Sequence, residues 1–393
     1  MLEISKTMKE LFYYTDYILF ILLSISVGYL TIFSFFSMVK KGRRYPKAIK
    51  KFKFLVLIPA YKEDNVIFDS VKSVLEQEYP SDKFDLVVIS DRMTDHTNSL
   101  LSQERLTLHK ISPENSSKAY ALNFAITNLK HFNYDVVVIL DADNVVPKNY
   151  LDDINDIFYS GSKALQTHRI AKNLNTDMAI LDAISEEINN SIFRRGHVNI
   201  GLSSALIGSG MAFDFKWFSS KVKYLKTSGE DKELEIMLLK DCVYIDFADY
   251  IYVYDEKIQK EDAFYNQRRR WLAAQFYSLV QGIKDLPQTI MNNNIDYIDK
   301  VIQWALLPRI IVMGLIGILT LLNTFFDFYG SIKWWVLLMI LFFAFAMAIP
   351  DYLVNKRSIR TFLKIPLLFM LMVLNLFRLR GVTKKFIHTE KGI

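Results

Sequence analysis

Carboxylates gather where two apolar runs of this sequence end. Asp141 and Asp143 follow the run at 135–140, and Asp91 directly follows an earlier run at 85–90. Alternate side chains of an extended segment point the same way, so the paired carboxylates are expected on one side of the chain. Carboxylate oxygens are what hard divalent cations bind, and such cations also take phosphate oxygens. The pair therefore indicates a cation site facing a phosphate, although a solvated turn after a buried strand has the same pattern.

A second acidic pair, Glu230-Asp231, follows Gly229 and precedes an apolar run with helical spacing at 234–239. Acidic residues at the start of a helix commonly cap it, which is the structural interpretation. The chemical interpretation is that Asp231 is a general base, because a carboxylate can take the proton of an attacking hydroxyl. The motif alone leaves both interpretations open.

The cationic sequence Gln267-Arg268-Arg269-Arg270-Trp271 is the strongest single motif. Three consecutive guanidinium groups are costly to bury without anions, so they are expected to face phosphate, carboxylate or water. Arginine binds phosphate bidentately, and an indole offers a flat wall to a sugar ring or a guanidinium. A basic patch at a membrane surface is the alternative.

Short apolar runs that alternate with helical patterns predict the framework behind these groups. The runs at 54–59, 85–90 and 135–140 are typical of buried strands, and 66–78 and 117–129 have helical patterns. This alternation favours an α/β fold with a mostly parallel sheet covered on both faces. Ligands bind beyond the carboxyl ends of such strands. The side chains expected at that crevice are Tyr61, Glu63, Asp91, Asp141 and Asp143.

Long uncharged runs near both ends of the chain predict membrane helices. Of 393 residues, 51% are hydrophobic, and residues 17–39 are 23 residues without a charge. That length crosses a hydrocarbon core of about 30 Å, and the absence of a small-residue cleavage site argues against a removable signal peptide. Runs at 310–326 and 334–350 predict two further spans joined by an outward link. The residues expected at the membrane interface are Trp304, Arg309, Trp334 and Trp335.

Basic clusters indicate how these helices are oriented. Eight basic residues follow the first helix between positions 40 and 53, so the positive-inside rule places the N-terminus outside and the next domain in the cytosol. Beside a membrane, such a cluster favours anionic lipid over nucleic acid as its partner. The run at 365–377 has only 13 residues and is followed by four cations, which favours an interfacial or re-entrant helix. The single cysteine, Cys242, allows no internal disulfide and no thiolate metal cluster.

With these residues in place, the chain resembles the membrane-embedded, inverting family 2 glycosyltransferases, which include cellulose, hyaluronan and poly-N-acetylglucosamine synthases. Ser90 stands where many relatives have a first of two acids, and Asp214 and Phe215 stand where many have a basic residue. These departures bear on the identity of the acceptor more than on the chemistry. The matching motifs are Ile58-Pro59-Ala60-Tyr61-Lys62-Glu63, Ser90-Asp91, Lys118 with Ala121-Leu122-Asn123, Asp141-Ala142-Asp143, Gly208-Ser209-Gly210, Gly229-Glu230-Asp231 and Gln267-Arg268-Arg269-Arg270-Trp271.

The resemblance implies a GT-A type fold, in which a Rossmann-like nucleotide-sugar transferase domain is flanked by transmembrane helices. It implies Asp231 as the catalytic base and Asp143 as the ligand of Mg²⁺ or Mn²⁺. The implied donor-binding residues are Pro59, Tyr61, Glu63, Asp91, Lys118, Asp141, Asp143, Gln267 and Arg270. The implied acceptor-binding residues are Gly208, Ser209, Gly210, Glu230 and Trp271, with the glycines leaving room for a sugar.

The resulting expectation is a hexosyl- or N-acetylhexosaminyltransferase. It would move a sugar from a nucleotide sugar, with UDP-sugars the first choice, to a hydroxyl of a growing polysaccharide or lipid-linked glycan, forming a β linkage. The expected parts are an N-terminal membrane helix with its basic segment at 1–45, a cytosolic transferase domain at 46–298 and a C-terminal membrane region at 299–393.

Two alternatives stay open. One is an enzyme that adds a single sugar to a lipid such as polyprenyl phosphate or diacylglycerol, and the other is a non-catalytic membrane scaffold that binds sugar nucleotides. The expected partners are the donor, the acceptor and membrane lipids, without nucleic acid, and the sequence identifies no export subunit.

Overall fold

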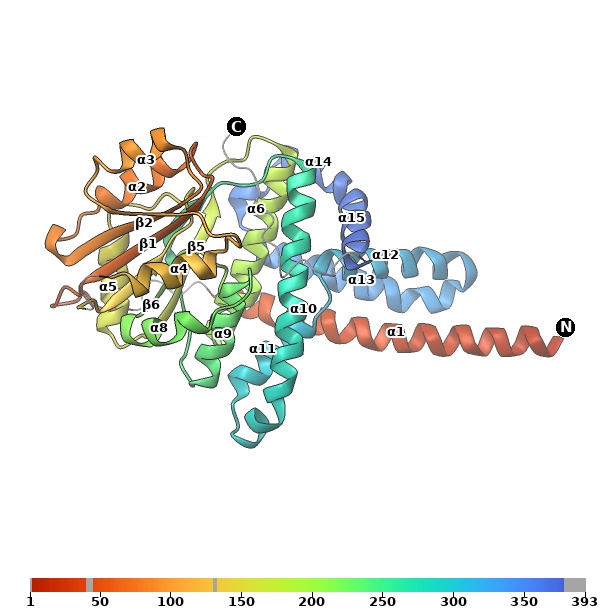
Figure 1. Cartoon of the computed structure of the whole chain (residues 1–393). Coiled ribbons are helices and arrows are strands. Elements are labelled where there is room, and N and C mark those ends of the chain that lie inside the picture. The colour runs from red at the N-terminus through yellow and green to blue at the C-terminus, as the bar shows by residue number, and fades with distance from the viewer. Residues whose placement is uncertain (1, 40–44, 130–132, 378–393) are drawn as a thin grey trace.

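Apolar runs form the centre of a mixed sheet in the computed structural model, which describes residues 2–39, 45–129 and 133–377. Over these residues the seven strands have the order β3-β2-β1-β4-β6-β5-β7 (Figure 1). The β1–β2, β2–β3, β1–β4 and β5–β7 pairs are parallel, and only the two pairs made by β6 are antiparallel. The strands are β1 (Phe54–Tyr61), β2 (Phe84–Asp91), β3 (Thr107–Ile111), β4 (Val136–Ile139), β5 (Ala164–Ala171), β6 (Met211–Asp214) and β7 (Asp246–Asp255). The predicted α/β fold with a mostly parallel sheet is confirmed.

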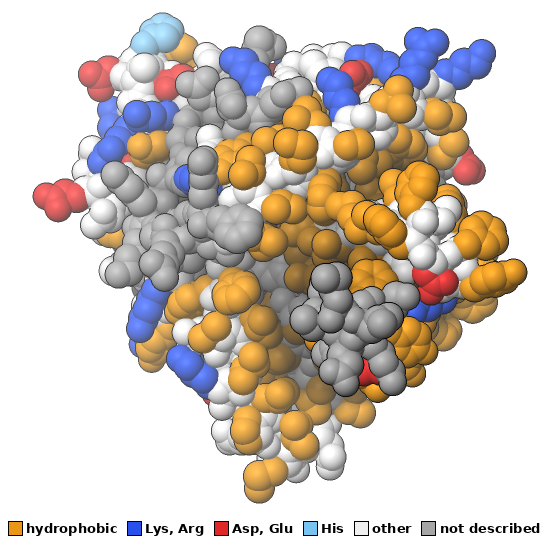
Figure 2. All heavy atoms as spheres, turned by 90° about the vertical axis from the view of Figure 1, so that its right-hand side faces the viewer, with side chains coloured by type: hydrophobic (Ala, Val, Ile, Leu, Met, Phe, Trp, Pro, Cys, Tyr) orange, Lys and Arg blue, Asp and Glu red, His pale blue; other side chains and the backbone are white. Residues whose placement is uncertain are grey.

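Apolar helices extend away from the sheet as a separate layer. Helices α1 (Leu2–Ser37), α12 (Arg309–Phe326) and α13 (Phe328–Ala348) lie side by side and project in one direction (Figure 1). Four described segments, 10–37, 309–326, 328–348 and 356–376, are long and apolar enough to cross a membrane. Figure 2 shows hydrophobic side chains over most of the described part of the face from which these helices project, with lysine and arginine side chains mainly at its edges. A lipid environment would solvate such a face.

The last described helical segment is longer than the sequence predicted. A 3₁₀ turn, η5 (Phe362–Lys364), joins α14 (Lys356–Thr361) to α15 (Ile365–Phe377), so the helical stretch starts before the expected run at 365–377. Its length and composition suffice for a span. However, α15 packs against α10 (Glu261–Met291) and α12, and it runs crosswise to α1 and α13 (Figure 1). The interfacial helix therefore stays a prediction, and the cations that follow residue 377 lie outside the described residues, as do those at 40–44.

Two tryptophans expected at the membrane interface lie inside the protein instead. The Trp334 side chain is buried, and its Nε1 donates a hydrogen bond of 2.8 Å to Asp16 Oδ1. The same carboxylate forms an ion pair with Lys333 and accepts from Asn323. Trp304 is also buried, against Gly282 of α10. A tryptophan at the edge of an apolar run can lie at the membrane interface, or it can be buried with its N–H bonded to an acceptor inside the protein. The sequence position does not distinguish the two.

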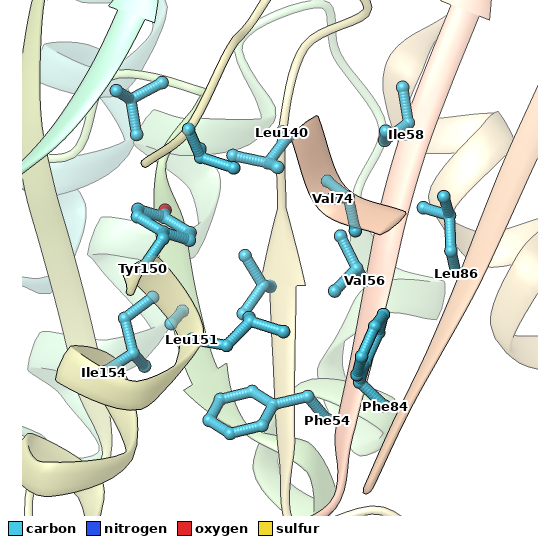
Figure 3. Close-up of a cluster of buried hydrophobic side chains, with 14 of the residues drawn as sticks. Phe54, Val56, Ile58, Val74, Phe84, Leu86, Leu140, Tyr150, Leu151 and Ile154 are labelled. Carbon is cyan, nitrogen blue, oxygen red and sulfur yellow. The ribbon is translucent and has the colours of Figure 1, made fainter. Parts of the chain in front are cut away.

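Helices cover both faces of the sheet because side chains alternate along its strands. Phe54, Val56 and Ile58 of β1 pack against α2 (Ile67–Leu75) and α5 (Tyr150–Tyr159), as Figure 3 shows. Leu55 and Leu57 point the other way. The helices on that second face are α4 (Lys118–Thr127), α8 (Phe215–Lys221), α9 (Glu230–Lys240) and α11 (Ile295–Ala305). Helices thereby cover both faces of the sheet. The carboxyl edge of β1, β2 and β4 faces α10 and the apolar helices α12, α13 and α15.

Candidate active site

A cavity of ≈ 1290 Å³ opens at the carboxyl edge of the parallel strands. Its walls come from the ends of β1, β2 and β4, from the first turn of α9, and from α6 (Asp177–Asn189), α10 and the apolar helices. All but two of the predicted site residues line it: Pro59, Tyr61, Glu63, Asp91, Lys118, Asp141, Asp143, Gly208, Glu230, Asp231, Gln267, Arg270 and Trp271. Motifs up to 212 positions apart in the sequence therefore share one space.

Three carboxylates form a cluster on one wall of the cavity. One oxygen each from Asp141, Asp143 and Asp255 lies within 4.8 Å of the others. The side-chain amide of Asn144 connects two of them, because its Nδ2 donates hydrogen bonds of 3.3 Å to Asp143 Oδ1 and 3.2 Å to Asp255 Oδ1. An all-oxygen set suits a hard divalent cation such as Mg²⁺ or Mn²⁺. Asp255, the last residue of β7, was not predicted from the sequence.

Buried ion pairs surround the Asp255 end of this cluster. Lys257 Nζ donates 2.9 Å to Asp255 Oδ2, and Arg169 Nη1 lies 3.8 Å from Asp255 Oδ1. Glu186 of α6 forms ion pairs with both of these cations. Burial raises the pKa of Glu186, but Arg169, Lys257 and Arg194 together lower this pKa to about 2. Asp255 therefore has two cationic neighbours, Lys257 and Arg169, on the side of the cluster that faces α6.

Strands β1 and β2 end side by side at Tyr61 and Asp91, and both chains then turn sharply. Lys62 and Arg92 have φ of 55° and 57°, and the Lys62 N–H donates 3.1 Å to the Asp91 carbonyl. Left-handed backbone is unfavourable for side chains of this size and is often found at functional sites. Asp91 is 3% exposed, and its Oδ1 accepts no hydrogen bond from any described residue. Burial raises the pKa of Asp91, against the lowering effects of Ser116 and Arg92. The carboxyl group lines the cavity, where this oxygen can accept a hydrogen bond from a ligand.

Lys118, the first residue of α4, connects the acid cluster with the acidic motif of α9. Its Nζ donates 2.5 Å to Asp141 Oδ1 and 2.6 Å to the Gly208 carbonyl, and lies 3.6 Å from Glu230 Oε1. Burial disfavours its charged form, yet Asp141 and Glu230 raise the pKa of Lys118 above its ordinary value. Lys118 is therefore a fixed cation between two groups of carboxylates.

Close packing between α9 and α10 positions Asp231. A Cβ built on Gly229 would lie 2.8 Å from the Cβ of Ala274, so glycine lets the start of α9 approach α10. Asp231 lies in the first turn of α9, where the helix dipole favours a carboxylate, and its Oδ1 accepts 2.8 Å from the Lys232 N–H. Asp231 also lines the cavity. The structural and the chemical interpretations of this motif are thus compatible.

The three arginines of α10 have different surroundings. Arg268 donates 2.5 Å to Asp182 Oδ1 and lies 4.5 Å from the ring centre of Trp271. Arg269 lies 6.0 Å from the ring centre of Tyr265. Burial lowers the pKa of Arg270, against the opposing effect of Glu230, Asp141 and Asp231. Arg270 thus lines the cavity within electrostatic range of both acidic groups, and a guanidinium in that place can bind phosphate.

The glycine motif of the predicted acceptor side needs a correction. Gly208 lines the cavity, but Ser209 and Gly210 do not. A Cβ on Gly210, whose φ is +63°, would lie 2.5 Å from Thr167 Oγ1 and 3.0 Å from Val253 Cγ2. Ser209 is buried, and its carbonyl accepts 2.9 Å from Gln166 Nε2. Packing against the neighbouring strands, rather than room for a sugar, explains this part of the motif.

Comparison with known proteins decides the family. The family described as "Glycosyltransferase like family 2" matches residues 52–274, more than half of the chain. The chain belongs to glycosyltransferase family 2.

Two curated relatives each match a part of this glycosyltransferase. It is 31% identical over 117 residues to a probable glycosyltransferase of Bacillus subtilis, covering 28% of this chain and 27% of that protein. It is 23% identical over 241 residues to a beta-monoglucosyldiacylglycerol synthase of Nostoc, covering 59% and 51%. The chain thus spans about half or less of the length of these curated relatives.

A solved structure supports the fold. A mannosyltransferase from Pyrobaculum calidifontis, in complex with GDP-Man and Mn²⁺, matches with a TM-score of 0.53 over 84% of this chain and 97% of that one. The two are 16% identical, so the likeness concerns the fold alone.

The buried Glu230 carboxyl should give the glycosyltransferase a distinct pH dependence of stability. Burial raises its pKa from 4.5 to about 7, with Lys118 opposing the rise and Asp231 adding to it. The folded protein then binds more protons than the unfolded chain between these values, so stability falls as pH rises through that window. We expect Glu230→Gln, relative to the wild type, to gain a few degrees in Tm on going from pH 5 to pH 8. Thermal unfolding in metal-free detergent buffer measures this, with the exposed Glu76→Gln as control. Parallel curves for Glu230→Gln and wild type would contradict it.

Proposed function

We propose that this protein transfers a sugar, with inversion, from a UDP-sugar to a hydroxyl of a growing polysaccharide or lipid-linked glycan. One observation carries the proposal: a carboxylate cluster suited to a divalent cation, a helix-start carboxylate and a buried arginine all open onto one cavity. A base, a metal site and a diphosphate clamp are what a single displacement at an anomeric carbon requires. The intact acids also make a non-catalytic scaffold a poor explanation.

In the proposed reaction Asp231 takes the proton of the acceptor hydroxyl. The hydroxyl oxygen attacks the anomeric carbon while the bond from that carbon to the nucleoside diphosphate breaks, so an α-linked donor gives a β-linked product. Arg270 stabilises the charge that develops on the diphosphate. Asp143, with Asp141 beside it, would hold Mg²⁺ or Mn²⁺, and such an ion neutralises diphosphate charge when bound.

The remaining cavity residues divide between donor and acceptor. Pro59, Tyr61, Glu63 and Asp91 lie at the ends of β1 and β2 and would hold the base and ribose, with the buried Asp91 oxygen as an acceptor for a base N–H. Gln267 would join Arg270 at the diphosphate. The residues proposed for the acceptor are Gly208, Glu230 and Trp271.

We further propose that the catalytic domain is cytosolic and that the N-terminus is outside. The start of α1 and the turn between α12 and α13 lie on the same side, away from the sheet (Figure 1). Basic residues described at 47–53 lie on the sheet side of α1, as the positive-inside rule requires.

A direct assay tests this function. Membranes containing the protein are incubated with radiolabelled UDP-glucose, UDP-N-acetylglucosamine and GDP-mannose, and the product is extracted and sized. When Mg²⁺ or Mn²⁺ is present, radiolabel from at least one donor should enter a polymer or a lipid-soluble product. We expect that donor to be a UDP-sugar. No transfer from a full panel of nucleotide sugars would overturn the proposal.

Trp271→Ala should reduce sugar transfer more than it reduces nucleotide affinity. The indole lines the cavity one helical turn from Arg268, whose guanidinium stacks on it. Loss of a flat wall for the acceptor should lower kcat/KM by about tenfold, the worth of one stacking contact of ~1.4 kcal/mol. UDP affinity should stay near the wild-type value in a fluorescence titration. Equal losses in transfer and affinity would argue against an acceptor role.

A further inference from the structure

The cavity continues from the catalytic carboxylates into the membrane region. Its polar part holds the predicted site residues, and its other part lies between α12, α13 and α15. Side chains of that second part include Leu321, Leu338, Phe342, Phe369 and Met372, which are all apolar. At ≈ 1290 Å³ the whole space exceeds the ~300–1000 Å³ usual for one small ligand. Donor and acceptor can therefore occupy it together.

One face of α12 forms a continuous wall of the apolar part. Arg309, Met313, Gly317 and Leu321 are spaced four residues apart, and all four line the cavity. Twelve residues of helix at 1.5 Å each make this wall about 18 Å long. A Cβ added to Gly317 would meet nothing within 4 Å, so the wall is hollowed at its third position. This is space for an extended apolar chain.

Arg309 stands where the polar and apolar parts meet. Its Nη2 donates 3.1 Å to the Ser185 carbonyl and 3.3 Å to Ser185 Oγ, whereas its Nη1 has no hydrogen-bond partner among the described residues. No described carboxylate lies within 4.0 Å of it, and Glu186 acts on it only from farther away, whereas neighbouring Arg268 is paired with Asp182. A half-buried guanidinium without an anion is unfavourable, and phosphate is the anion whose geometry it matches.

We propose that the acceptor is a lipid with a phosphate between its apolar tail and the hydroxyl that receives the sugar. The tail would lie between α12, α13 and α15, the phosphate at Arg309, and the hydroxyl at Asp231. The proposal rests on the function proposed above: the hydroxyl proton passes to Asp231, the hydroxyl oxygen bonds to the anomeric carbon, and the diphosphate leaves with the electrons of its bond. A phosphate monoester nucleophile is already ionised near neutral pH and would need no base. A phospholipid with a hydroxylated headgroup and a saccharide on a lipid diphosphate share this chemistry.

Two variants test the tail and the phosphate separately. Gly317→Phe fills the hollow of α12, and Gly28→Phe is its control, since Gly28 also has open space around it but lies on α1 outside the cavity. Arg309→Met removes the cation, and the exposed Arg360→Met is its control. The acceptors offered are phosphatidylglycerol, a polyprenyl diphosphate-linked N-acetylglucosamine, diacylglycerol and a soluble oligosaccharide.

The wild type should use one of the two phosphate-bearing lipids in preference to diacylglycerol and the oligosaccharide, and which one identifies the source. Arg309→Met should raise KM for that lipid about 10- to 100-fold, the effect of losing a charge-assisted hydrogen bond. Gly317→Phe should reduce transfer to it to a similar extent. Both variants should bind UDP like the wild type, and both controls should transfer normally.

Two results would overturn the proposal: equal use of the soluble oligosaccharide by the wild type, or Gly317→Phe and Arg309→Met behaving like their controls. Failure of the underlying function is distinguishable, because the wild type would then consume no nucleotide sugar with any acceptor.

Discussion

Asp231→Asn should lower the rate of sugar transfer by about 10²- to 10⁴-fold, the usual contribution of a positioned general base. Asparagine has the size of aspartate but cannot take a proton from the acceptor hydroxyl. The donor side should be intact, since the carboxylate cluster and Arg270 keep their positions. Initial rates with a radiolabelled nucleotide sugar, together with UDP affinity by titration, measure the two effects separately.

Asp241→Asn is the matched control for this variant. Asp241 follows the same helix at its other end, where it pairs with Lys221 and accepts 2.8 Å from Trp217 Nε1. It does not line the cavity. Transfer by Asp241→Asn should be near the wild-type rate. Wild-type turnover by Asp231→Asn would remove Asp231 from the role of base.

Asp143→Asn should lower kcat/KM by about 10³-fold, which corresponds to ~4 kcal/mol of lost charge stabilisation. Asp143 is 1% exposed and lies in the cluster with Asp141 and Asp255. Replacing a carboxylate by an amide there weakens the attraction for a divalent cation, and diphosphate charge is then neutralised less well. The variant should also lose the Mn²⁺-dependent part of UDP affinity, which titration with and without the ion measures.

Asp82→Asn serves as the control for Asp143→Asn, because Asp82 is exposed and lies outside the cavity. Chelation of divalent ions should reduce the wild type to the level of Asp143→Asn and should have little further effect on that variant. If transfer and UDP affinity depend on the divalent ion as strongly in Asp143→Asn as in the wild type, the ion is not bound at Asp143.

Unbroken apolar runs made the centre of the fold predictable. The three runs read from the sequence became β1, β2 and β4, because strands buried on both faces carry no polar interruption. Strand β5 was missed, since its centre is Gln166, Thr167, His168 and Arg169, which read as exposed. These side chains are buried with partners from distant segments: His168 lies between Glu187 and Asp249, and Arg169 pairs with Glu186. Only the tertiary structure supplies those partners.

The candidate site was predictable to the extent that it depends on strand ends. Parallel strands end at one edge, so Tyr61, Asp91 and Asp141 could be placed together from the sequence. Asp255 could not be placed there, because it lies 112 positions after Asp143. It ends strand β7, which was not predicted because its sequence has no unbroken apolar run. Arg309 was read as an interfacial anchor, since nothing in its sequence surroundings shows a cavity between helices.

The anomeric configuration of the product tests the central claim most directly. Purified protein is given the preferred α-linked nucleotide sugar with Mn²⁺ and an acceptor, and the new linkage is determined by NMR for the wild type and for Asp231→Asn. A single displacement assisted by Asp231 predicts a β linkage from the wild type and almost no product from the variant. An α linkage, or equal product from both proteins, would contradict the mechanism.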